Sequence, residues 1–371
     1  MCIRDSNNSL CTLTSADPAA RMPANCLLRG VPGSYTRVSG EAQWKRSFTD
    51  SFGQVFTPFV KVRADVAAAS ITNSPGVANY LAPGDSTEFR AMPTVGLEYR
   101  YPFISVQPWG THTIEPIAQV IVRPNETNIG KLPNEDSQSL VFDDTNLFKI
   151  DKFAGWDRIE GGGRANVGIK STTQFNRGGS ITTVFGQSYQ LFGVNSFANS
   201  DYTNTGLNSG LDTARSDYVA RLTYQPDRIY AFNTRFRFDH DTFEVKQFEA
   251  EARASFDRWS VSMLYGRYDP QPALGFLSLR EGILGTASVK LSQNWLATAS
   301  VRYDIDANSL VGTVFGIGYI DDCLIVAMNY IANYTYSGNV GTDQRIMLQM
   351  TLRTLGGTSI SQGIGGMGNG L

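Results

Sequence analysis

The sequence predicts an all-β protein, an antiparallel transmembrane β-barrel of the outer-membrane type, present here as a partial barrel of about fifteen strands. Three observations lead to this fold class. Apolar and polar residues alternate with period two along most of the chain from Arg37 onward. Long and short connections alternate between the strands, and the polar face of the strands carries ions of both signs. A sheet with one face in lipid and the other in water explains all three.

The clearest strands lie within residues 295–334. From Trp295 to Ile305, apolar or aromatic residues alternate with polar ones, which is the period of a strand with two unlike faces. Turn sequences at Asp306–Asn308 and Asp321–Asp322 separate this strand from two more of similar length. The stretch therefore predicts three consecutive hairpin strands.

The other predicted strands run along the rest of the chain. They cover 37–48, 55–71, 95–101, 111–123, 161–174, 180–190, 218–224, 230–239, 247–256, 259–268, 281–291 and, last, 344–355. No useful window has apolar residues at i, i+3, i+4 and i+7, so no amphipathic helix is predicted.

The connections sort by length onto two rims. One rim carries the long ones, at 72–90, 124–160, 191–215, 269–279 and 336–343. The other carries tight turns, at 49–54, 176–179, 226–228, 257–258 and 292–294, with 102–110 as the longest of that set. The turn at Asp306 is a short exception on the long rim. Such sorting is typical of outer-membrane barrels, and a soluble sandwich has no reason for it.

The polar face of the strands is predicted to line a wide lumen. A water-filled lumen tolerates ions of both signs, whereas the core of a small barrel does not. Aromatic residues gather near strand ends, as interfacial girdles do. An exposed sheet of a soluble solenoid is the alternative, but no fixed short repeat supports it. The predicted lumen residues are Arg221, Arg235, Arg237, Glu249, Glu251, Arg253 and Arg302.

Composition bounds the domains and excludes some partners. Basic and acidic residues nearly balance, 32 against 34, so nucleic-acid binding is not predicted. We expect an irregular segment over 1–36, of which 1–6 reads as a possible artefact, a barrel over 37–355 and a Gly-rich tail over 356–371.

Cys11 and Cys26 could close a local disulfide or remain free thiols, and Cys323 has no obvious partner inside the chain.

Candidate catalytic and metal-binding residues are few. His240 stands between Asp239 and Asp241 at a strand end, and without a Gly-x-Ser-x-Gly elbow a solvated turn is the better interpretation than a hydrolase site. His112 is read as an ordinary interfacial residue. Glu135, Asp136, Asp143 and Asp144 in the longest loop could bind calcium, although the EF-hand spacing is missing. We therefore predict no catalytic residue, no metal and no cofactor.

Several stretches together resemble one family. They are THTIEPIAQVIVRPNE (111–126), SLVFDDTNLFKIDKFAGWDRIEGG (139–162), GIGYIDDCLIVAMNY (316–330) and MLQMTLRTLGG (347–357). They are similar to the LptD family of lipopolysaccharide-assembly proteins of the Gram-negative outer membrane, also called organic solvent tolerance proteins (OstA/Imp). The family's extracellular loop element "Gly-x-Asp-Arg-Ile" matches Gly155, Trp156, Asp157, Arg158 and Ile159.

The resemblance implies a function without enzymatic chemistry. It implies an outer-membrane translocon subunit that inserts lipopolysaccharide (LPS) into the outer leaflet through a polar lumen and a lateral seam. Its implied partners are LPS, an LptE-like lipoprotein plug, and an LptA-like periplasmic bridge reached through an N-terminal domain. That domain and the first barrel strands have no counterpart in this sequence, so the chain is expected to be the C-terminal part of a longer barrel.

The resemblance also assigns roles near the C-terminus. It makes 344–355 one lip of the lateral seam, with Arg345, Met347, Gln349, Thr351 and Arg353 along it. Where the family has two adjacent cysteines, this chain has Asp322–Cys323, so the resemblance implies a disulfide from Cys323 to the N-terminal domain. A free thiol is the alternative.

Two other functional classes stay open at this point. A diffusion porin or ligand-gated transporter would conduct ions and would need no lipoprotein partner. An outer-membrane hydrolase would depend on His240.

Overall fold

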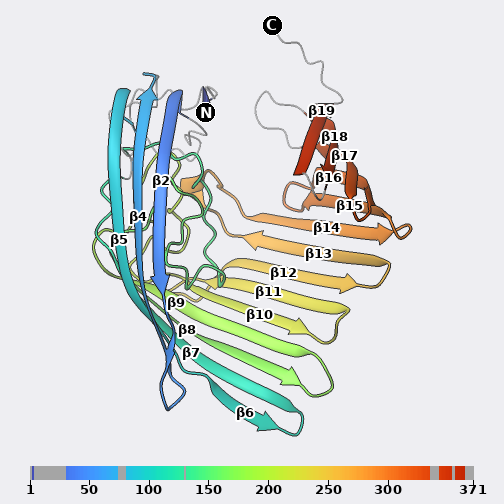
Figure 1. Cartoon of the computed structure of the whole chain (residues 1–371), viewed down its shortest axis with the longest axis horizontal. Helices are drawn as coiled ribbons and strands as arrows, with labels where there is room; N and C mark the ends of the chain where they lie inside the picture. The colour runs from blue at the N-terminus through green and yellow to red at the C-terminus, as the bar shows by residue number, and fades with distance from the viewer. Residues whose placement is uncertain are drawn as a thin grey trace.

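The strands form one antiparallel sheet that curls into an open arc (Figure 1). The structure is a computed structural model, which describes residues 2–3, 31–73, 81–128, 131–334, 342–352 and 356–363. From β4 onward nearly every strand pairs with its sequence neighbour, so the sheet follows the chain. The all-β, barrel-type fold predicted from the sequence is confirmed, and the sheet is not closed.

The strand bounds are as follows: β1 Cys2–Ile3, β2 Gly33–Lys45, β3 Phe48–Thr49, β4 Val55–Ile71, β5 Gly84–Arg100, β6 Phe103–Gln107, β7 Gly110–Val122, β8 Gly163–Phe175, β9 Ser180–Phe192, β10 Tyr218–Gln225, β11 Tyr230–Phe238, β12 Val245–Ser255, β13 Trp259–Tyr268, β14 Arg280–Lys290, β15 Trp295–Asp304, β16 Ser309–Ile320, β17 Leu324–Asn333, β18 Asp343–Leu352 and β19 Gly356–Gly363. A 3₁₀ helix, η3, covers Pro272–Leu274. Within the described residues, no helix has the length and apolar character needed to cross a membrane.

The predicted strands are present, and four further segments join them: β1, β3, β6 and β19. Two of these arise where proline interrupts a ladder. The gap between β2 and β3 lies opposite Pro58 of β4, and Pro102 separates β6 from β5. Proline has no N–H to donate, so the pairing breaks at these points and resumes beyond them. β1 pairs with β2 at Cys2 and Ile3, within the segment expected to be irregular.

The end of the sheet differs from the prediction. The sequence predicted that 344–355 is the last strand and that 356–371 is a Gly-rich tail. Instead β19 pairs with β18 from Gly356 opposite Leu352 to Gly363 opposite Arg345. The sequence GGTSISQG has no apolar alternation to reveal a strand, whereas the ladder uses backbone groups that every residue but proline carries. Among the residues that the structure describes, the edge strand at this end is therefore β19.

The connections sort onto two rims as predicted, although the predicted loop 72–90 is too long, because β5 already begins at Gly84. The long ones, at 123–162, 193–217 and 269–279, leave one rim, and the opposite rim carries short turns such as 176–179 and 256–258. The connection predicted over 102–110 shrinks to Pro108 and Trp109, because β6 follows β5 and continues its pairing with β7. The difference in length between the connections of the two rims is therefore larger in the structure than in the prediction.

The two faces of the sheet are arranged opposite to those of a soluble protein. Outward-facing aliphatic side chains on β4, β5 and β7 are 43% to 54% exposed: Val60, Val62, Val95, Leu97, Val120 and Val122. On the inward face of neighbouring strands, polar side chains are buried: Arg63, Asp65, Arg90, Gln119 and Asn166. An apolar exterior around a polar interior is the arrangement of a sheet that faces lipid.

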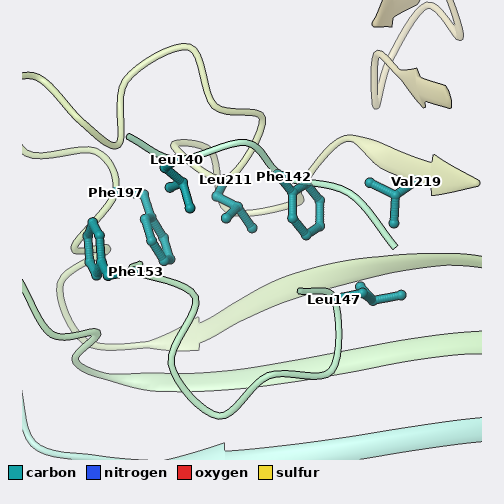
Figure 2. Close-up of a cluster of buried hydrophobic side chains, with 7 residues drawn as sticks. All are labelled: Leu140, Phe142, Leu147, Phe153, Phe197, Leu211 and Val219. Atoms are coloured by element: carbon teal, nitrogen blue, oxygen red, sulfur yellow. The ribbon is translucent and has the colours of Figure 1, made fainter. Parts of the chain in front are cut away.

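Two long connections fold back onto the concave face of the sheet (Figure 1). We call residues 123–162 the first inner loop and residues 193–217 the second inner loop. A buried apolar cluster joins the two loops to the start of β10 (Figure 2). Its members are Leu140, Phe142, Leu147, Phe153, Phe197, Leu211 and Val219. A second buried cluster joins the second inner loop to β4 and consists of Val31, Ala69, Ile71, Leu81 and Tyr202.

Glycines on the wall let the first inner loop approach closely. Gly168 of β8 and Gly186 of β9 lie directly opposite each other. A Cβ atom at Gly186 would lie 2.5 Å from Leu147 Cδ2, and one at Gly168 would lie 3.1 Å from Phe148 Cζ. The loop therefore packs against bare backbone, which only glycine offers.

Candidate functional site

The element Gly155–Arg158, singled out in the sequence, lies against the inner face of β2, β4 and β5. It forms the part of the first inner loop that is fixed to the wall. Each of its residues has a distinct set of partners, which come from strands and loops far apart in the chain.

Asp157 joins the loop to β2. Its Oδ1 accepts hydrogen bonds from Tyr35 Oη at 3.0 Å and from the guanidinium of Arg37. Its Oδ2 accepts the backbone N–H groups of Glu135 at 2.7 Å and Asp136 at 3.0 Å. A buried carboxylate with this many donors holds the loop firmly in place, because each hydrogen bond offsets part of the cost of removing the carboxylate from water.

Asp136 completes the same joint from the other arm of the loop. Its carboxylate accepts the backbone N–H groups of Trp156 at 3.0 Å and Asp157 at 2.8 Å, and it pairs with Arg37 at 3.0 Å. Burial alone would raise the pKa of Asp136, but these hydrogen bonds hold it well below its usual range. A Cβ atom at Gly155 would lie 2.5 Å from the Asp136 carbonyl oxygen, so glycine is required there.

Two arginines of the wall hold the backbone of Trp156. The carbonyl oxygen of Trp156 accepts hydrogen bonds from Arg63 and, at 2.9 Å, from Arg90 Nη2. The guanidinium of Arg63 also lies 4.5 Å from the centre of the Trp156 ring. Asp65 lies between the two arginines and pairs with Arg63 at 3.2 Å and with Arg90 at 2.8 Å. Glu126 lies 3.6 Å from Arg90, so Asp65 and Glu126 together balance the two positive charges that face the loop.

Arg158 connects the first inner loop to the second. Its Nε donates to Asp201 Oδ2 at 2.9 Å, and its Nη1 donates to the carbonyl oxygen of Leu132 at 3.3 Å. Burial tends to raise the pKa of Asp201, but Arg158 and Thr203 lower it below the usual value. The two inner loops are therefore held together by a buried ion pair as well as by the apolar cluster.

Glu160 is a site residue that the sequence reasoning missed. It is 0% exposed and lies between Arg123, at 3.0 Å, and Arg164 of β8. Burial would raise its pKa, but Arg123, Lys152 and Arg164 lower the pKa of Glu160 to about 2. Its position in the sequence could have indicated this role, because Glu160 directly follows the Gly155–Ile159 element and lies close to two arginines.

Lys152 is the other buried ion that the sequence reasoning missed. Its side chain is almost fully enclosed, and its Nζ donates to Asn166 Oδ1 at 3.2 Å and to the Lys149 carbonyl oxygen at 3.4 Å. Burial lowers the pKa of Lys152 to about 7, although Glu160 acts in the opposite direction. This amine therefore loses its proton near neutral pH while the loop is folded.

The lowered pKa of Lys152 predicts a pH dependence. Above about pH 7 the unfolded loop holds a proton on Lys152 that the folded loop has released, so loop stability rises with pH until about 10, where the unfolded amine also titrates. We expect a slope of up to about 1.4 kcal/mol per pH unit. The midpoint of urea unfolding of the full-length protein, followed by tryptophan fluorescence, should rise between about pH 7.5 and about pH 9.5.

A matched pair of variants isolates this effect. Lys152→Met should flatten the rise, whereas Lys149→Met, at an exposed position three residues earlier, should retain it. A rise of the same size in the Lys152→Met protein would contradict the assignment.

Of the predicted lumen residues, three reach the inner loops. Arg221 pairs with Asp144 at 3.0 Å, and Arg235 lies 3.5 Å from Asp144 and 3.3 Å from Glu249. Arg237 is buried and donates to the Ser209 carbonyl oxygen at 2.7 Å. Glu251 is half-buried, and Arg253 and Arg302 are exposed. The loops, which the sequence reasoning left outside the barrel, therefore occupy space assigned to the lumen.

The structure separates the four loop carboxylates considered for calcium. Asp136 is engaged by Arg37 and backbone N–H groups, whereas Asp144 is engaged by Arg221 and Arg235. Across the described residues, the only cluster with potential metal ligands close together is Asp217, Asp239 and His240.

The carboxylates of that cluster already have basic side chains as partners. Asp217 faces Arg237 at 3.3 Å, and Asp239 faces Lys246 at 3.8 Å. His240 Nδ1 lies 3.4 Å from Asp217 Oδ1. The cationic partners account for these carboxylates, and the geometry does not select a metal.

The remaining predicted residues lie apart from this site. His112 Nδ1 lies 2.7 Å from Thr173 Oγ1 on the neighbouring strand. Cys323 is an exposed free thiol on the short-turn rim, where its backbone N–H donates to Asp321 at 2.9 Å. Arg345, Met347, Gln349 and Thr351 lie on β18. Cys11, Cys26 and Arg353 fall outside the described residues.

Comparisons with known proteins agree with this architecture. The family model described as "LptD: LPS transport system D" matches residues 5–275. A curated relative, the "LPS-assembly protein LptD" of Burkholderia ambifaria, is 24% identical over 305 residues, which cover 77% of this chain and 37% of the relative. The chain therefore spans less than two fifths of the length of that relative.

Proposed function

This chain belongs to the LptD family, and from that premise we propose that it forms part of the barrel wall and the inner loops of an outer-membrane translocon that inserts LPS into the outer leaflet. In this proposal the apolar outer face contacts lipid, and the polar inner face forms the side of the passage for the sugars of LPS. The protein acts by binding and guiding its substrate, without enzymatic chemistry.

The observation that carries the proposal is the burial of a polar wall beneath anchored loops. Arg63, Asp65 and Arg90 are buried on the inner face, while the aliphatic side chains of the same strands are exposed. Charged groups of this kind are stable in a lipid-embedded sheet only where they face a polar interior. An amphiphile with a large polar head and apolar tails needs this pairing of surfaces.

The seam of the proposed translocon lies at the β19 edge. Because β19 is the edge strand, it replaces 344–355 as one lip, and Arg345, Met347, Gln349 and Thr351 of β18 lie one strand behind it. A lateral opening requires a ladder weak enough to separate, since unpaired backbone groups in lipid cost several kcal/mol each. β19 has glycine at three positions, Gly356, Gly357 and Gly363, and glycine weakens a strand because it brings no side chain to pack.

The partners in this proposal follow from the family. They are LPS, an LptE-like lipoprotein in the lumen, and an LptA-like periplasmic bridge reached through an N-terminal domain of the longer protein. Cys323, exposed on the rim of short turns, is proposed to form a disulfide with that domain. The rim of short turns is periplasmic in outer-membrane barrels, where disulfides form.

Depletion of the full-length protein in its host bacterium tests the proposal. We expect newly made LPS to be lost from the cell surface, measured by labelling intact cells, while porins already in the membrane remain. Re-expression of the wild-type protein should restore surface LPS. Normal surface LPS after depletion would overturn the function.

The alternative is a diffusion porin. The inner loops disfavour it, because they cover the concave face with a packed core that is joined to the wall by the ion pairs Arg37–Asp157 and Arg164–Glu160. Ion conductance of the full-length protein in a planar bilayer distinguishes the two functions. We expect conductance far below that of a porin of equal strand number, and an open channel of porin size would favour the alternative.

A further inference from the structure

A cavity of about 550 Å³ lies between the inner loops and the wall formed by β11 to β15. The first inner loop contributes Ser139 to its lining, and the second contributes Thr203 and Thr205. Arg302 of β15 lines it from the wall. The cavity is separate from the joint around Asp157, and two of its lining residues, Arg237 and Arg302, belong to the predicted lumen set.

One row of side chains across the sheet forms most of the wall of the cavity. Strand register places Arg237 opposite Gln247, Gln247 opposite Tyr268, and Tyr268 opposite Arg280. All four line the cavity. Side chains opposite each other in an antiparallel sheet lie on the same face, so β11 to β14 present two guanidinium groups, an amide and a phenol along one line.

The cavity has an excess of positive charge. Among the residues that the structure describes, no aspartate or glutamate lines it, but three arginines do. Arg237 faces Asp217 at 3.3 Å outside the lining. Neither Arg280 nor Arg302 has a carboxylate within ion-pair distance in the described part of the chain. Two of the three positive charges are therefore uncompensated.

Arg280 is positioned as a binding residue. Its guanidinium lies 3.7 Å from the centre of the Phe276 ring and 5.4 Å from that of Tyr268. One of its N–H groups donates to the side-chain oxygen of Gln271. Its buried Nε has no hydrogen-bond partner among the described residues. A guanidinium held between aromatic rings with donors to spare matches the planar geometry of a phosphate or carboxylate.

We propose that this cavity binds the anionic group of a sugar, a phosphate or carboxylate on a saccharide. The guanidinium groups of Arg280 and Arg302 bind the anion, the hydroxyl group of Ser139 binds a sugar hydroxyl, and Phe276 packs on the sugar ring. Binding of such an anion follows from the cavity alone. Identification of the sugar as part of LPS rests on the proposed function.

Titration of the purified full-length protein in detergent tests the site, with glucosamine 1-phosphate, inorganic phosphate and neutral glucosamine as probes and ³¹P NMR and calorimetry as readouts. Glucosamine 1-phosphate should bind at least about tenfold more tightly than inorganic phosphate, because it adds contacts to the sugar, and neutral glucosamine should bind more weakly than either. Arg280→Gln and Arg302→Gln should each weaken binding of glucosamine 1-phosphate by about tenfold.

The control is Arg267→Gln on β13. Arg267 pairs with Glu281 at 3.5 Å and does not line the cavity, so binding should not change. Equal affinities for glucosamine 1-phosphate and inorganic phosphate would overturn the assignment to a sugar. No binding of either, or binding unaffected by the double variant Arg280→Gln/Arg302→Gln, would overturn the site itself.

This test is independent of LPS transport. If the depletion experiment leaves surface LPS normal while glucosamine 1-phosphate still binds, the proposed function fails and the site stands. If surface LPS is lost on depletion but the cavity binds no anion, the site fails and the function stands.

Discussion

Replacement of Glu160 by glutamine is expected to release the first inner loop from the wall at a cost of about 3–5 kcal/mol, because loss of one partner from a buried ion pair leaves uncompensated charge. Here Arg123 and Arg164 both lose their carboxylate, and Lys152 loses a neighbouring charge. Glutamine keeps the shape of the side chain, so the effect reports charge rather than packing.

The measurement is protease cleavage within residues 123–162 of the folded full-length protein, together with the midpoint of urea unfolding. Glu41→Gln is the matched control. Glu41 pairs with Lys61 at 2.8 Å in a partly exposed position, where an ion pair contributes less than about 1 kcal/mol. Equal cleavage of the Glu160→Gln and Glu41→Gln proteins would show that the buried network does not hold the loop.

Gly186→Val is expected to have the second-largest effect, a destabilisation of about 3 kcal/mol from overpacking. The first added carbon would lie 2.5 Å from both Leu147 Cδ2 and the Val167 carbonyl oxygen, and the two methyl groups add further overlap. The loop must move away from β9, which exposes the apolar cluster around Leu147. Binding of a fluorescent apolar dye and cleavage of the loop should both increase.

Gly285→Val supplies the comparison for this prediction. Gly285 lies in β14, and a Cβ atom there would have no neighbouring atom within 4 Å. Valine favours extended backbone, so this variant should be as stable as the wild-type protein or slightly more stable. If both valine variants behaved alike, the effect at Gly186 would come from strand propensity and not from contact with the loop.

Most of the wall could be predicted from the sequence, because period-two alternation and connection length are local properties. The alternation from Trp295 to Ile305 corresponds to β15, which covers Trp295–Asp304. β19 could not be predicted in this way. An edge strand of glycine and polar residues is held by backbone hydrogen bonds to β18, and these leave no pattern in side-chain chemistry.

The site could be predicted only in part. Gly155–Arg158 was recognised through a resemblance, but the sequence could not show that the loop folds inward, because its partners Tyr35, Arg37 and Arg63 come from strands far away in the chain. Glu160 was missed for the same reason. Glu160 holds the loop only because it is buried between two arginines, and that burial is a property of the folded structure.

The inner loops also bear on the order of folding. The wall is built almost entirely of hairpins between neighbouring strands, so its pairings are close in sequence and form with little loss of chain entropy. The bond from Tyr35 to Asp157, by contrast, joins residues 122 positions apart. It can form only after β2, β4, β5 and β7 are already side by side. Seating of the loop is therefore a late step, and a strand inserted in the wrong register would separate buried charges such as Arg90 and Asp157 from their partners on other elements. The ion pairs that hold the loop thus act as a check that the wall has been assembled correctly.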